Sequence, residues 1–191
     1  MSIRIHGNRS LKTLPGKQTR PTPAKVRQAL FNIWQGEIVD CRWLDLCAGS
    51  GAMGAEALCR GAIAVTGIEQ SSPACAIIHQ NWKQVTQPHQ TIRLMRGHIL
   101  KQLPKLNGQQ FDRIYFDPPY TSDLYRPVLE AIATYALLAN GGELAVEHHP
   151  DKCPPPNISS ASQYQGKSVD LKTIRSKQYG STAITFYHSL S

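Results

Sequence analysis

Residues 42–62 read RWLDLCAGSGAMGAEALCRGA, and this stretch decides the fold. An apolar strand runs into a turn in which Gly49, Gly51 and Gly54 have the spacing GxGxxG, and a helix follows that Gly61 stops. Glycines at this spacing let the chain turn tightly, and they let a ligand approach the backbone and the first amides of the helix. The stretch therefore predicts the first strand–turn–helix of an α/β fold, with a nucleotide-like ligand at the turn.

Strands and helices alternate through most of the chain. Strands are expected at 42–47, 63–68, 91–95, 111–117 and 142–147, and helices at 23–35, 52–60, 72–85, 98–103 and 124–138. Thr22 is expected to cap the first helix, and Gly141-Gly142 to stop the last. Such alternation predicts a parallel sheet that binds ligands at the carboxyl ends of its strands. A short hairpin or extended arm is expected within 2–14, an irregular loop over 149–161, and a closing antiparallel hairpin from 168–175 and 181–188.

Two acidic residues flank the glycine turn. Asp45 precedes the glycines, and Glu69 follows the next strand, where an acid is placed to accept hydrogen bonds from ribose hydroxyls. A carboxylate at Asp45 would repel the pyrophosphate of a dinucleotide, but it would attract a ligand with sulfonium and ammonium charges. This points to S-adenosylmethionine. The alternatives are that Asp45 caps a helix or pairs with an arginine, and that Glu69 is solvated.

The tetrapeptide Asp117-Pro118-Pro119-Tyr120 stands at the carboxyl end of the fourth strand of the alternation. The exocyclic amine of a nucleobase is a poor nucleophile because its lone pair is delocalised into the ring. Asp117 can accept one N–H of such an amine and the Pro118 carbonyl the other, which turns the lone pair toward a methyl donor. The prolines stiffen the loop, and Tyr120 offers a flat face to an extruded base. An ordinary strand-exit turn is the alternative.

The net charge of +8 is unevenly distributed. Residues 1–36 carry seven basic groups and no acid, residues 37–150 carry nine basic and eleven acidic groups, and residues 151–191 carry five basic and two acidic groups. A basic arm beside a near-neutral middle suggests a polyanionic partner held through phosphate contacts. We therefore expect a basic arm and helix at 1–36 and a catalytic domain at 37–191. A merely solvated basic surface is the alternative.

Composition excludes several other classes. A hydrophobic content of 41% argues against disorder, no apolar run approaches the roughly 18 residues of a membrane span, and the first residues lack the apolar stretch of a signal peptide. The five cysteines are scattered without a CxxC pair, so we expect a reducing cytoplasm and neither disulfides nor a zinc site. His148-His149 near Cys153 could suggest a metal, but a solvated loop is the expectation there.

Several motifs resemble known families. Asp45-xxx-Gly49-x-Gly51 with Glu69 resembles the cofactor motifs of seven-strand class I methyltransferases, and the tetrapeptide resembles the [DN]PP[YFW] motif of those that act on exocyclic or amide nitrogens. Residues 45–62 match the string D-x-x-A-G-S-G-x-x-G-x-E-A-x-x-R-G-A of the RsmD family, the bacterial 16S rRNA guanine-N2 methyltransferases. The segments Thr19-Arg20-Pro21-Thr22-Pro23, 26–33 and Tyr179-Gly180-x-Thr182-Ala183 are similar to that family too.

The resemblance implies a Rossmann-like class I methyltransferase fold: a seven-stranded, mostly parallel sheet with one antiparallel strand, plus a small basic N-terminal extension. It implies a cytoplasmic, monomeric, metal-free enzyme that moves a methyl group from S-adenosylmethionine to the N2 amine of one guanine in 16S rRNA, in an assembling small subunit. The cofactor residues would be Asp45, Ala48, Gly49, Ser50, Gly51, Glu69, Gln70, Gly97, His98, Ile99 and Asp117. The catalytic residues would be Asp117, Pro118, Pro119 and Tyr120, and the RNA-binding residues Arg4, Arg9, Lys12, Lys17, Arg20, Thr22 and Arg27.

Departures from the family pattern leave some roles open. His98 stands where such enzymes often have an acid that holds the adenine amine, and Ser181 also stands where an acid is common. The opening Arg4-Ile5-His6-Gly7 and the proline-rich loop at 153–156 differ as well. Arg27 could pair with a core acid instead of RNA. The competing functions are a nitrogen methyltransferase on another RNA or on DNA, a catalytically silent RNA-binding assembly factor and, more distantly, a nicotinamide-dependent oxidoreductase.

Overall fold

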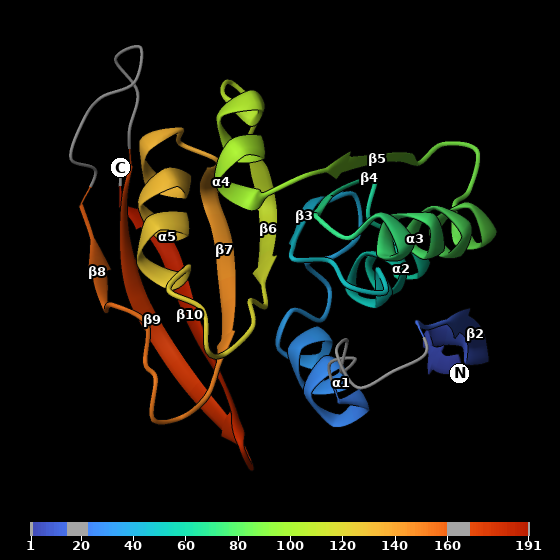
Figure 1. Ribbon diagram of the computed structural model, residues 1–191, viewed down its shortest axis with the longest axis horizontal. Coiled ribbons are helices and arrows are strands. Elements are labelled where there is room, and N and C mark those ends of the chain that lie inside the picture. The colour runs from blue at the N-terminus through green and yellow to red at the C-terminus, as the bar shows by residue number, and fades with distance from the viewer. Residues whose placement is uncertain (1, 15–22, 160–168, 191) are drawn as a thin grey trace. The chain divides into compact units, whose positions relative to one another are not determined.

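The computed structural model describes residues 2–14, 23–159 and 169–190. They belong to two compact units, Met1–Gly97 and His98–Ser191 (Figure 1). Among the helices of these described ranges, none combines the length and the apolar character needed to cross a membrane.

The first unit contains three neighbouring parallel strands in the order β5-β4-β3 and a separate antiparallel hairpin. Its elements are β1 (Ser2–Ile5), the 3-10 turn η1 (His6–Asn8), β2 (Arg9–Lys12), α1 (Ala24–Ile33), β3 (Arg42–Leu46), α2 (Ala52–Cys59), β4 (Ala64–Glu69), α3 (Ser72–Val85) and β5 (Thr91–Arg96). Helices α2 and α3 lie side by side on one face of the parallel strands (Figure 1). The hairpin and the strand–helix alternation predicted for this part of the chain are confirmed.

Helix α1 packs its apolar face into the core of the first unit. The ring of Phe31 stacks on that of Trp43 with centroids 5.3 Å apart. Trp34 meets the Trp43 ring edge-on, with centroids 5.6 Å apart. All three rings are fully buried, and burial of an aromatic side chain stabilises the fold by about 1.5–3 kcal/mol. The helix begins directly after Pro23, and the predicted cap at Thr22 lies outside the described residues.

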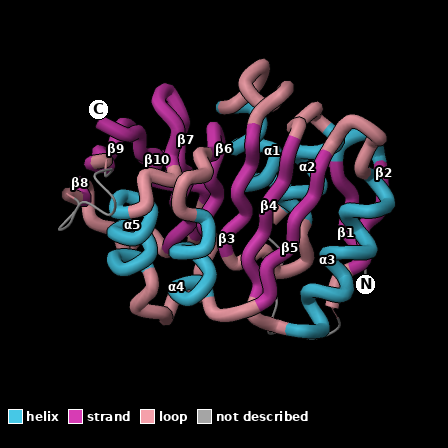
Figure 2. The backbone as a smooth tube through the Cα atoms, turned by 90° about the horizontal axis from the view of Figure 1, so that it is seen from above, coloured by secondary structure: helices cyan, strands magenta, loops and turns pink. Residues whose placement is uncertain are grey.

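The second unit is built on strands in the order β6-β7-β10-β9-β8. Its elements are α4 (Ile99–Gln102), η2 (Leu103–Leu106), β6 (Phe111–Phe116), α5 (Tyr125–Thr134), β7 (Leu138–His148), β8 (Asn157–Ile158), β9 (Asp170–Tyr179) and β10 (Thr182–Leu190). Strands β6 and β7 are parallel, and β10 runs antiparallel to β7, so the predicted late hairpin is confirmed. Helices α4 and α5 lie next to each other on one face of these strands (Figure 2). The short edge strand β8, inside the loop predicted at 149–161, was not expected.

The end of the last helix differs from the sequence prediction. Helix α5 stops at Thr134, four residues early, because Ala136 takes a left-handed conformation with φ of 48°. The amide of Ala136 then bonds the carbonyl of Ala133 and the amide of Leu137 bonds that of Ile132, which is the Schellman pattern usually made with glycine. Gly141-Gly142 therefore do not end a helix. They lie inside β7, where the pairing with β6 is irregular.

Candidate active site

The glycine turn connects β3 to α2, and three alternate residues in it are left-handed. Cys47, Gly49 and Gly51 have φ values of 62°, 57° and 71°, and the amide of Gly51 closes the turn on the carbonyl of Ala48 at 2.7 Å. Cys47 is a non-glycine residue in a conformation that costs free energy, and such strain is often found at binding loops. Among the described residues, a Cβ on Gly49 would meet one atom within 4 Å, the Cys47 carbonyl oxygen at 3.9 Å, so none of them crowds this glycine.

The other glycines of the motif make room for Trp82 on α3. A Cβ on Gly51 would lie 2.7 Å from Nε1 of Trp82, and one on Gly54 would lie 2.7 Å from its Cζ2. A Cβ on Gly67 of β4 would meet the same ring, at 2.5 Å from its Cη2. The indole Nε1 also donates to the Gly51 carbonyl at 2.8 Å. The motif thus has two tasks: Gly49 keeps the turn open, while Gly51 and Gly54 let the α3 tryptophan pack against it.

Asp45 sits on β3 beneath the turn and is 1% exposed. Its Oδ2 accepts the amide of Gly54, the third residue of α2, at 3.0 Å. It therefore acts as a helix cap from a distance, one of the alternatives left open by the sequence. Burial raises the pKa of Asp45 to about 7; the Gly54 hydrogen bond lowers that pKa and the negative charge of Glu69 adds to the rise. Two acids that oppose each other's ionisation in this way are suited to a cation.

Glu69 lies at the carboxyl end of β4 and fastens the turn. Its Oε2 accepts the amide of Gly49 at 2.9 Å, and its Oε1 accepts the amide of Ser71 at 2.8 Å. The amide of Gly97, just beyond β5, donates to the Glu69 carbonyl at 2.9 Å. Carboxyl ends of parallel strands share one edge of a sheet, and the cofactor residues predicted in this unit gather at that edge. These are Asp45, Ala48, Gly49, Ser50, Gly51, Glu69, Gln70 and Gly97. His98 and Ile99 open the second unit, His98 as the residue before α4.

Asn81, which the sequence analysis missed, joins the N-terminal hairpin to the glycine turn. Its side chain is fully buried on α3. Its Oδ1 accepts the amide of Lys12, and its Nδ2 donates to the carbonyls of Lys12 and Ser50, all at 2.9 Å. A polar residue on the apolar face of a helix was the available signal. The consequence is that β2 and the turn share one anchor.

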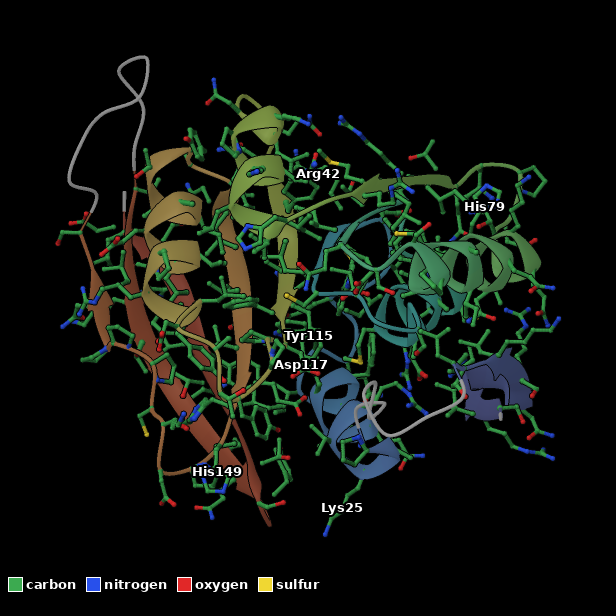
Figure 3. All side chains as sticks on the ribbon, viewed as in Figure 1. Lys25, Arg42, His79, Tyr115, Asp117 and His149 are labelled. Carbon is green, nitrogen blue, oxygen red and sulfur yellow. The ribbon has the colours of Figure 1, made fainter. Side chains whose placement is uncertain are left out.

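In the second unit the tetrapeptide leaves the end of β6, and Figure 3 shows Tyr115 and Asp117 at this exit. Asp117 and Tyr120 are half-buried, Pro118 is buried and Pro119 is exposed. The Pro119 carbonyl accepts the amide of Ser122 at 2.8 Å, which closes the loop on itself. The tetrapeptide is therefore followed by a hydrogen-bonded turn, and the stiffness expected from its two prolines stays a prediction.

A buried carboxylate, Glu147 on β7, lies behind the tetrapeptide. It is 2% exposed, and it accepts hydrogen bonds from the hydroxyls of Tyr115 and Tyr120, the second at 2.9 Å. The Tyr120 hydroxyl also lies 3.1 Å from that of Thr182. Burial raises the pKa of Glu147, and the two phenol donors lower it. Glu147 was not among the residues predicted from the sequence, although an acid inside the apolar run GELAVE was a usable signal.

The residues predicted to bind RNA fall into three groups. Arg4, Arg9 and Lys12 are exposed on the β1–β2 hairpin. Three others lie outside the described residues: Lys17, Arg20 and Thr22. The last, Arg27, is corrected by the structure.

Arg27 is 3% exposed and is committed to the core. Its Nε bonds Glu56 at 3.1 Å and its Nη2 bonds the Arg4 carbonyl, while Arg60 holds the other oxygen of Glu56 at 2.8 Å. A guanidinium that is paired with a buried acid is not available to bind phosphate. The alternative, a core ion pair, is therefore the better account of Arg27.

The expectation of a solvated loop at His148-His149 is wrong for His148. His148 is the last residue of β7, and its side chain is fully buried. Its Nε2 lies 2.8 Å from the Thr185 hydroxyl, and its Nδ1 lies 2.8 Å from the His149 carbonyl. Burial lowers its pKa, so the ring is neutral at pH 7. Within the described ranges, no group of three or more His, Cys, Asp or Glu side chains is arranged to hold a metal ion.

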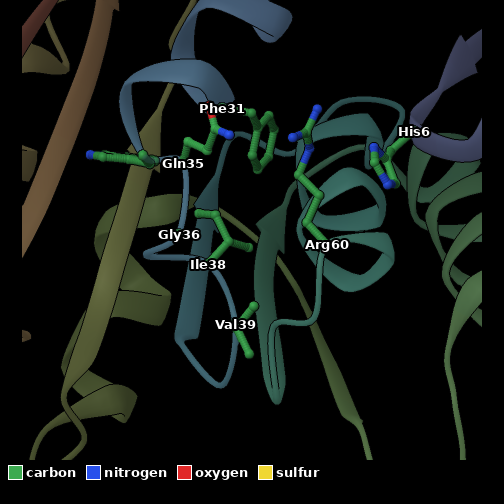
Figure 4. A pocket seen from close by; sticks show the side chains of 8 residues that line it. His6, Phe31, Gln35, Gly36, Ile38, Val39 and Arg60 are labelled. Atoms are coloured by element: carbon green, nitrogen blue, oxygen red, sulfur yellow. The ribbon is translucent and has the colours of Figure 1, made fainter.

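A pocket of about 210 Å³ opens on the first unit, away from the glycine turn (Figure 4). It is lined mainly by apolar side chains from α1 and the segment after it, with His6 and Arg60 at one side. The Arg60 guanidinium lies 4.9 Å from the centre of the Phe31 ring, a cation–π contact between two of the lining residues. Of the predicted site residues that the structure describes, none lines it.

The model of the family described as Conserved hypothetical protein 95 matches residues 3–188. The chain belongs to this family, the RsmD family. YlbH of Bacillus subtilis, by its name a candidate rRNA methyltransferase, is 31% identical over 181 residues, which are 94% of this chain and 92% of YlbH. Ribosomal RNA small subunit methyltransferase D of Escherichia coli is 31% identical over 149 residues, 76% of this chain and 74% of its own. A solved structure of YhhF from Escherichia coli, a candidate methyltransferase by its title, has a TM-score of 0.79 and 28% identity, and the match covers 99% of this chain and 98% of that one.

Membership of the RsmD family confirms the predicted fold class, and with it an enzyme of the methyltransferase class that uses S-adenosylmethionine. The likeness to YhhF extends over nearly the whole chain, so both units belong to that fold. The short strand β8 is an addition to the seven strands that were predicted.

Proposed function

We propose that this RsmD-family chain transfers a methyl group from S-adenosylmethionine to the exocyclic N2 amine of a guanine in 16S rRNA, and that its substrate is an assembling small ribosomal subunit in the cytoplasm. The proposal is supported by the names of its relatives and by the two sets of residues described above. The observation that carries it is the tetrapeptide Asp117-Pro118-Pro119-Tyr120 at the end of β6 in a chain of this family.

The cofactor side is supported by the chemistry of the donor set. Asp45 and Glu69 put two carboxylates at the glycine turn, which fits a cationic amino-acid sulfonium and disfavours a pyrophosphate. No described side chain crowds Gly49, which is compatible with a ligand against its backbone. Bound S-adenosylmethionine would supply an activated methyl group on a positively charged sulfur. The roles of Gln70, Gly97, His98 and Ile99 at the adenosine remain part of this proposal.

The substrate side is supported by the polar groups of the tetrapeptide. Asp117 and the Pro118 carbonyl would each accept one N–H of the guanine amine, so that its lone pair points along one direction. The carboxylate would also stabilise the positive charge that grows on nitrogen and receive the proton that nitrogen releases. Tyr120 would stack on the extruded base.

The RNA side is supported by charge. The exposed Arg4, Arg9 and Lys12 form a basic surface on the β1–β2 hairpin, and the sequence continues this surface with Lys17 and Arg20. Contacts to phosphate from such groups give affinity without sequence specificity. We propose that the basic arm supplies affinity for the RNA backbone and that the tetrapeptide selects the guanine base.

The test is transfer of a labelled methyl group from S-adenosylmethionine to three substrates: naked 16S rRNA, assembling small subunits and duplex DNA. Label in N2-methylguanine of rRNA is the expected result, and label in DNA alone would reject the rRNA proposal. Asp117→Ala should lose transfer while calorimetry shows that S-adenosylhomocysteine still binds. A variant with full transfer would remove Asp117 from the mechanism, and wild-type protein that binds no cofactor would favour the silent assembly factor.

A further inference from the structure

We propose that Glu147 is a positioning residue that holds the ring of Tyr120 in place as the stacking surface for the target base. This rests on the proposed function, which gives Tyr120 its contact with the guanine. The starting observation is that the Tyr120 hydroxyl donates a hydrogen bond to the Glu147 carboxylate on β7.

The burial of Glu147 needs an explanation of this kind. A carboxylate that is 2% exposed costs free energy unless it is well paired, and an apolar residue of similar size is often as stable or more stable at such a position. Within the described part of the chain, this carboxylate accepts hydrogen bonds from the hydroxyls of Tyr115 and Tyr120 and pairs with no cation. Its backbone carbonyl accepts a third phenol, that of Tyr125, at 3.3 Å.

The geometry at the tip of Tyr120 fixes the ring from two sides. The hydroxyl has one proton, which it donates to Glu147, so the contact with Thr182 is made by the threonine hydroxyl as donor. Burial raises the pKa of Tyr120, so the phenol keeps this proton at neutral pH. Glu147 lies on β7 and Thr182 on β10, and these paired strands form a rigid support.

The backbone end of the Tyr120 side chain is also constrained. Tyr120 follows two prolines, and its ring meets His149 edge-on with centroids 6.3 Å apart. A ring held at both ends is already ordered before a base arrives, which lowers the entropic cost of stacking and keeps the amine within reach of Asp117. Loss of Glu147 should therefore act on the orientation of the base rather than on cofactor binding.

The test compares Glu147→Leu, Glu147→Gln and Tyr120→Phe. We expect Glu147→Leu and Tyr120→Phe each to lower kcat on rRNA by about tenfold or more, with KM for the cofactor unchanged. Glu147→Gln keeps an acceptor oxygen and should recover part of the loss. The double variant Glu147→Leu/Tyr120→Phe should lose no more kcat than Glu147→Leu alone, because Glu147→Leu already removes the hydrogen bond to Tyr120.

The matched control is Tyr187→Phe in the same unit. The Tyr187 ring is fully buried and its hydroxyl donates to the Pro155 carbonyl at 2.7 Å, so this variant also deletes one buried phenol hydrogen bond. Tyr187→Phe should lower the free energy of unfolding by about as much as Tyr120→Phe does, and it should keep wild-type kcat. A similar loss of kcat in Tyr187→Phe, or a Glu147→Leu protein with wild-type kcat, would overturn the proposal.

A second measurement separates this inference from the proposed function. In spectra of protein with labelled tyrosine, the ring resonances of Tyr120, assigned with Tyr120→Phe, should shift and broaden in Glu147→Leu. Unchanged resonances would overturn the positioning role whatever the activity. Wild-type protein that transfers no methyl group to rRNA would contradict the proposed function, and the spectra would still decide whether Glu147 holds the ring.

Discussion

Asp45 combines two uses of one carboxylate. It caps α2 through the Gly54 amide, and the same burial raises its pKa to about 7. An acid with this pKa exchanges its proton near neutral pH, where a cationic ligand would hold it in the charged form. The structural role and the proposed cofactor role are therefore compatible at this position.

The first prediction follows from that pKa. In the free protein Asp45 takes up a proton as the pH falls through about 7, and a cationic cofactor must displace it. Affinity for S-adenosylmethionine should therefore rise by up to about tenfold per unit as the pH goes from about 5.5 to about 7.5. Calorimetry in buffers of different ionisation enthalpy should detect proton release. Asp45→Asn should bind more weakly with a flatter pH dependence, and a wild-type affinity that does not change with pH would contradict the role.

Single residues could be predicted from the sequence when a local motif identified them. Asp45, Glu69 and Asp117 stand beside glycines or prolines at strand ends, and their place in the chain indicated their chemistry. Glu147 and Asn81 have no local motif, because their partners come from other elements. The roles of Glu147 and Asn81 follow from their burial, and burial depends on the whole fold.

At the scale of elements, the first unit depends on how closely α2 and α3 approach. The indole of Trp82 lies over Gly51 and Gly54, and this contact sets the distance between the helices. The GxGxxG spacing predicted the turn correctly, but it did not reveal the tryptophan that two of its glycines accommodate. The early end of α5 was hidden for a similar reason, since Ala136 adopts a conformation in which glycine is usual.

The second prediction concerns Gly54. A Cβ there would lie 2.7 Å from Cζ2 of Trp82 and 2.9 Å from Cγ1 of Val65, too close for either group. Gly54→Ala should lower the free energy of unfolding by about 1–3 kcal/mol, as overpacked cores do. Urea denaturation measures this. In a Trp82→Phe background the smaller ring should reduce the loss, and an equal loss in both backgrounds would contradict the packing explanation.

The third prediction concerns the link made by Asn81. Asn81→Leu leaves the Lys12 amide and the Ser50 carbonyl without this partner, so the turn should become less ordered and affinity for S-adenosylhomocysteine should fall. Gln84→Ala is the matched control, because Gln84 lies on the same helix and bonds the Ser10 carbonyl of the hairpin but does not reach the turn. An equal affinity in both variants would show that the turn holds its shape without Asn81.

At the scale of the molecule, charge and chemistry are divided along the chain. The basic excess lies before residue 37 and after residue 150, whereas the middle carries more acids than bases. The uneven charge is read directly from the sequence, and the fold class could be predicted because strand–helix alternation is a property of the whole chain. The sequence did not show that the basic arm is attached to the core, through Leu11, Asn81 and the Arg27–Glu56 pair.

The fourth prediction uses that attachment. Deleting the arm would also remove packing from the first unit, so charge should be removed without backbone. Replacing Arg4, Arg9 and Lys12 by Gln should weaken RNA binding and flatten its dependence on salt by about 0.7–0.9 in log–log slope for each lost phosphate contact. Affinity for the cofactor should stay as in wild type. Arg126→Gln on α5, an exposed arginine outside the arm, is the control, and an unchanged salt slope in the triple variant would mean that the arm does not bind RNA.

The central claim is that this chain methylates a guanine of 16S rRNA through Asp117. The most direct measurement is a mass-spectrometric map of modified nucleotides in rRNA from four kinds of cell: those that have the gene, those that lack it, and deletion cells that carry either the wild-type gene or Asp117→Ala. We predict one N2-methylguanine in 16S rRNA that disappears in the deletion, returns with the wild-type gene and does not return with Asp117→Ala. The same modified nucleotides in all four rRNA samples would contradict the account.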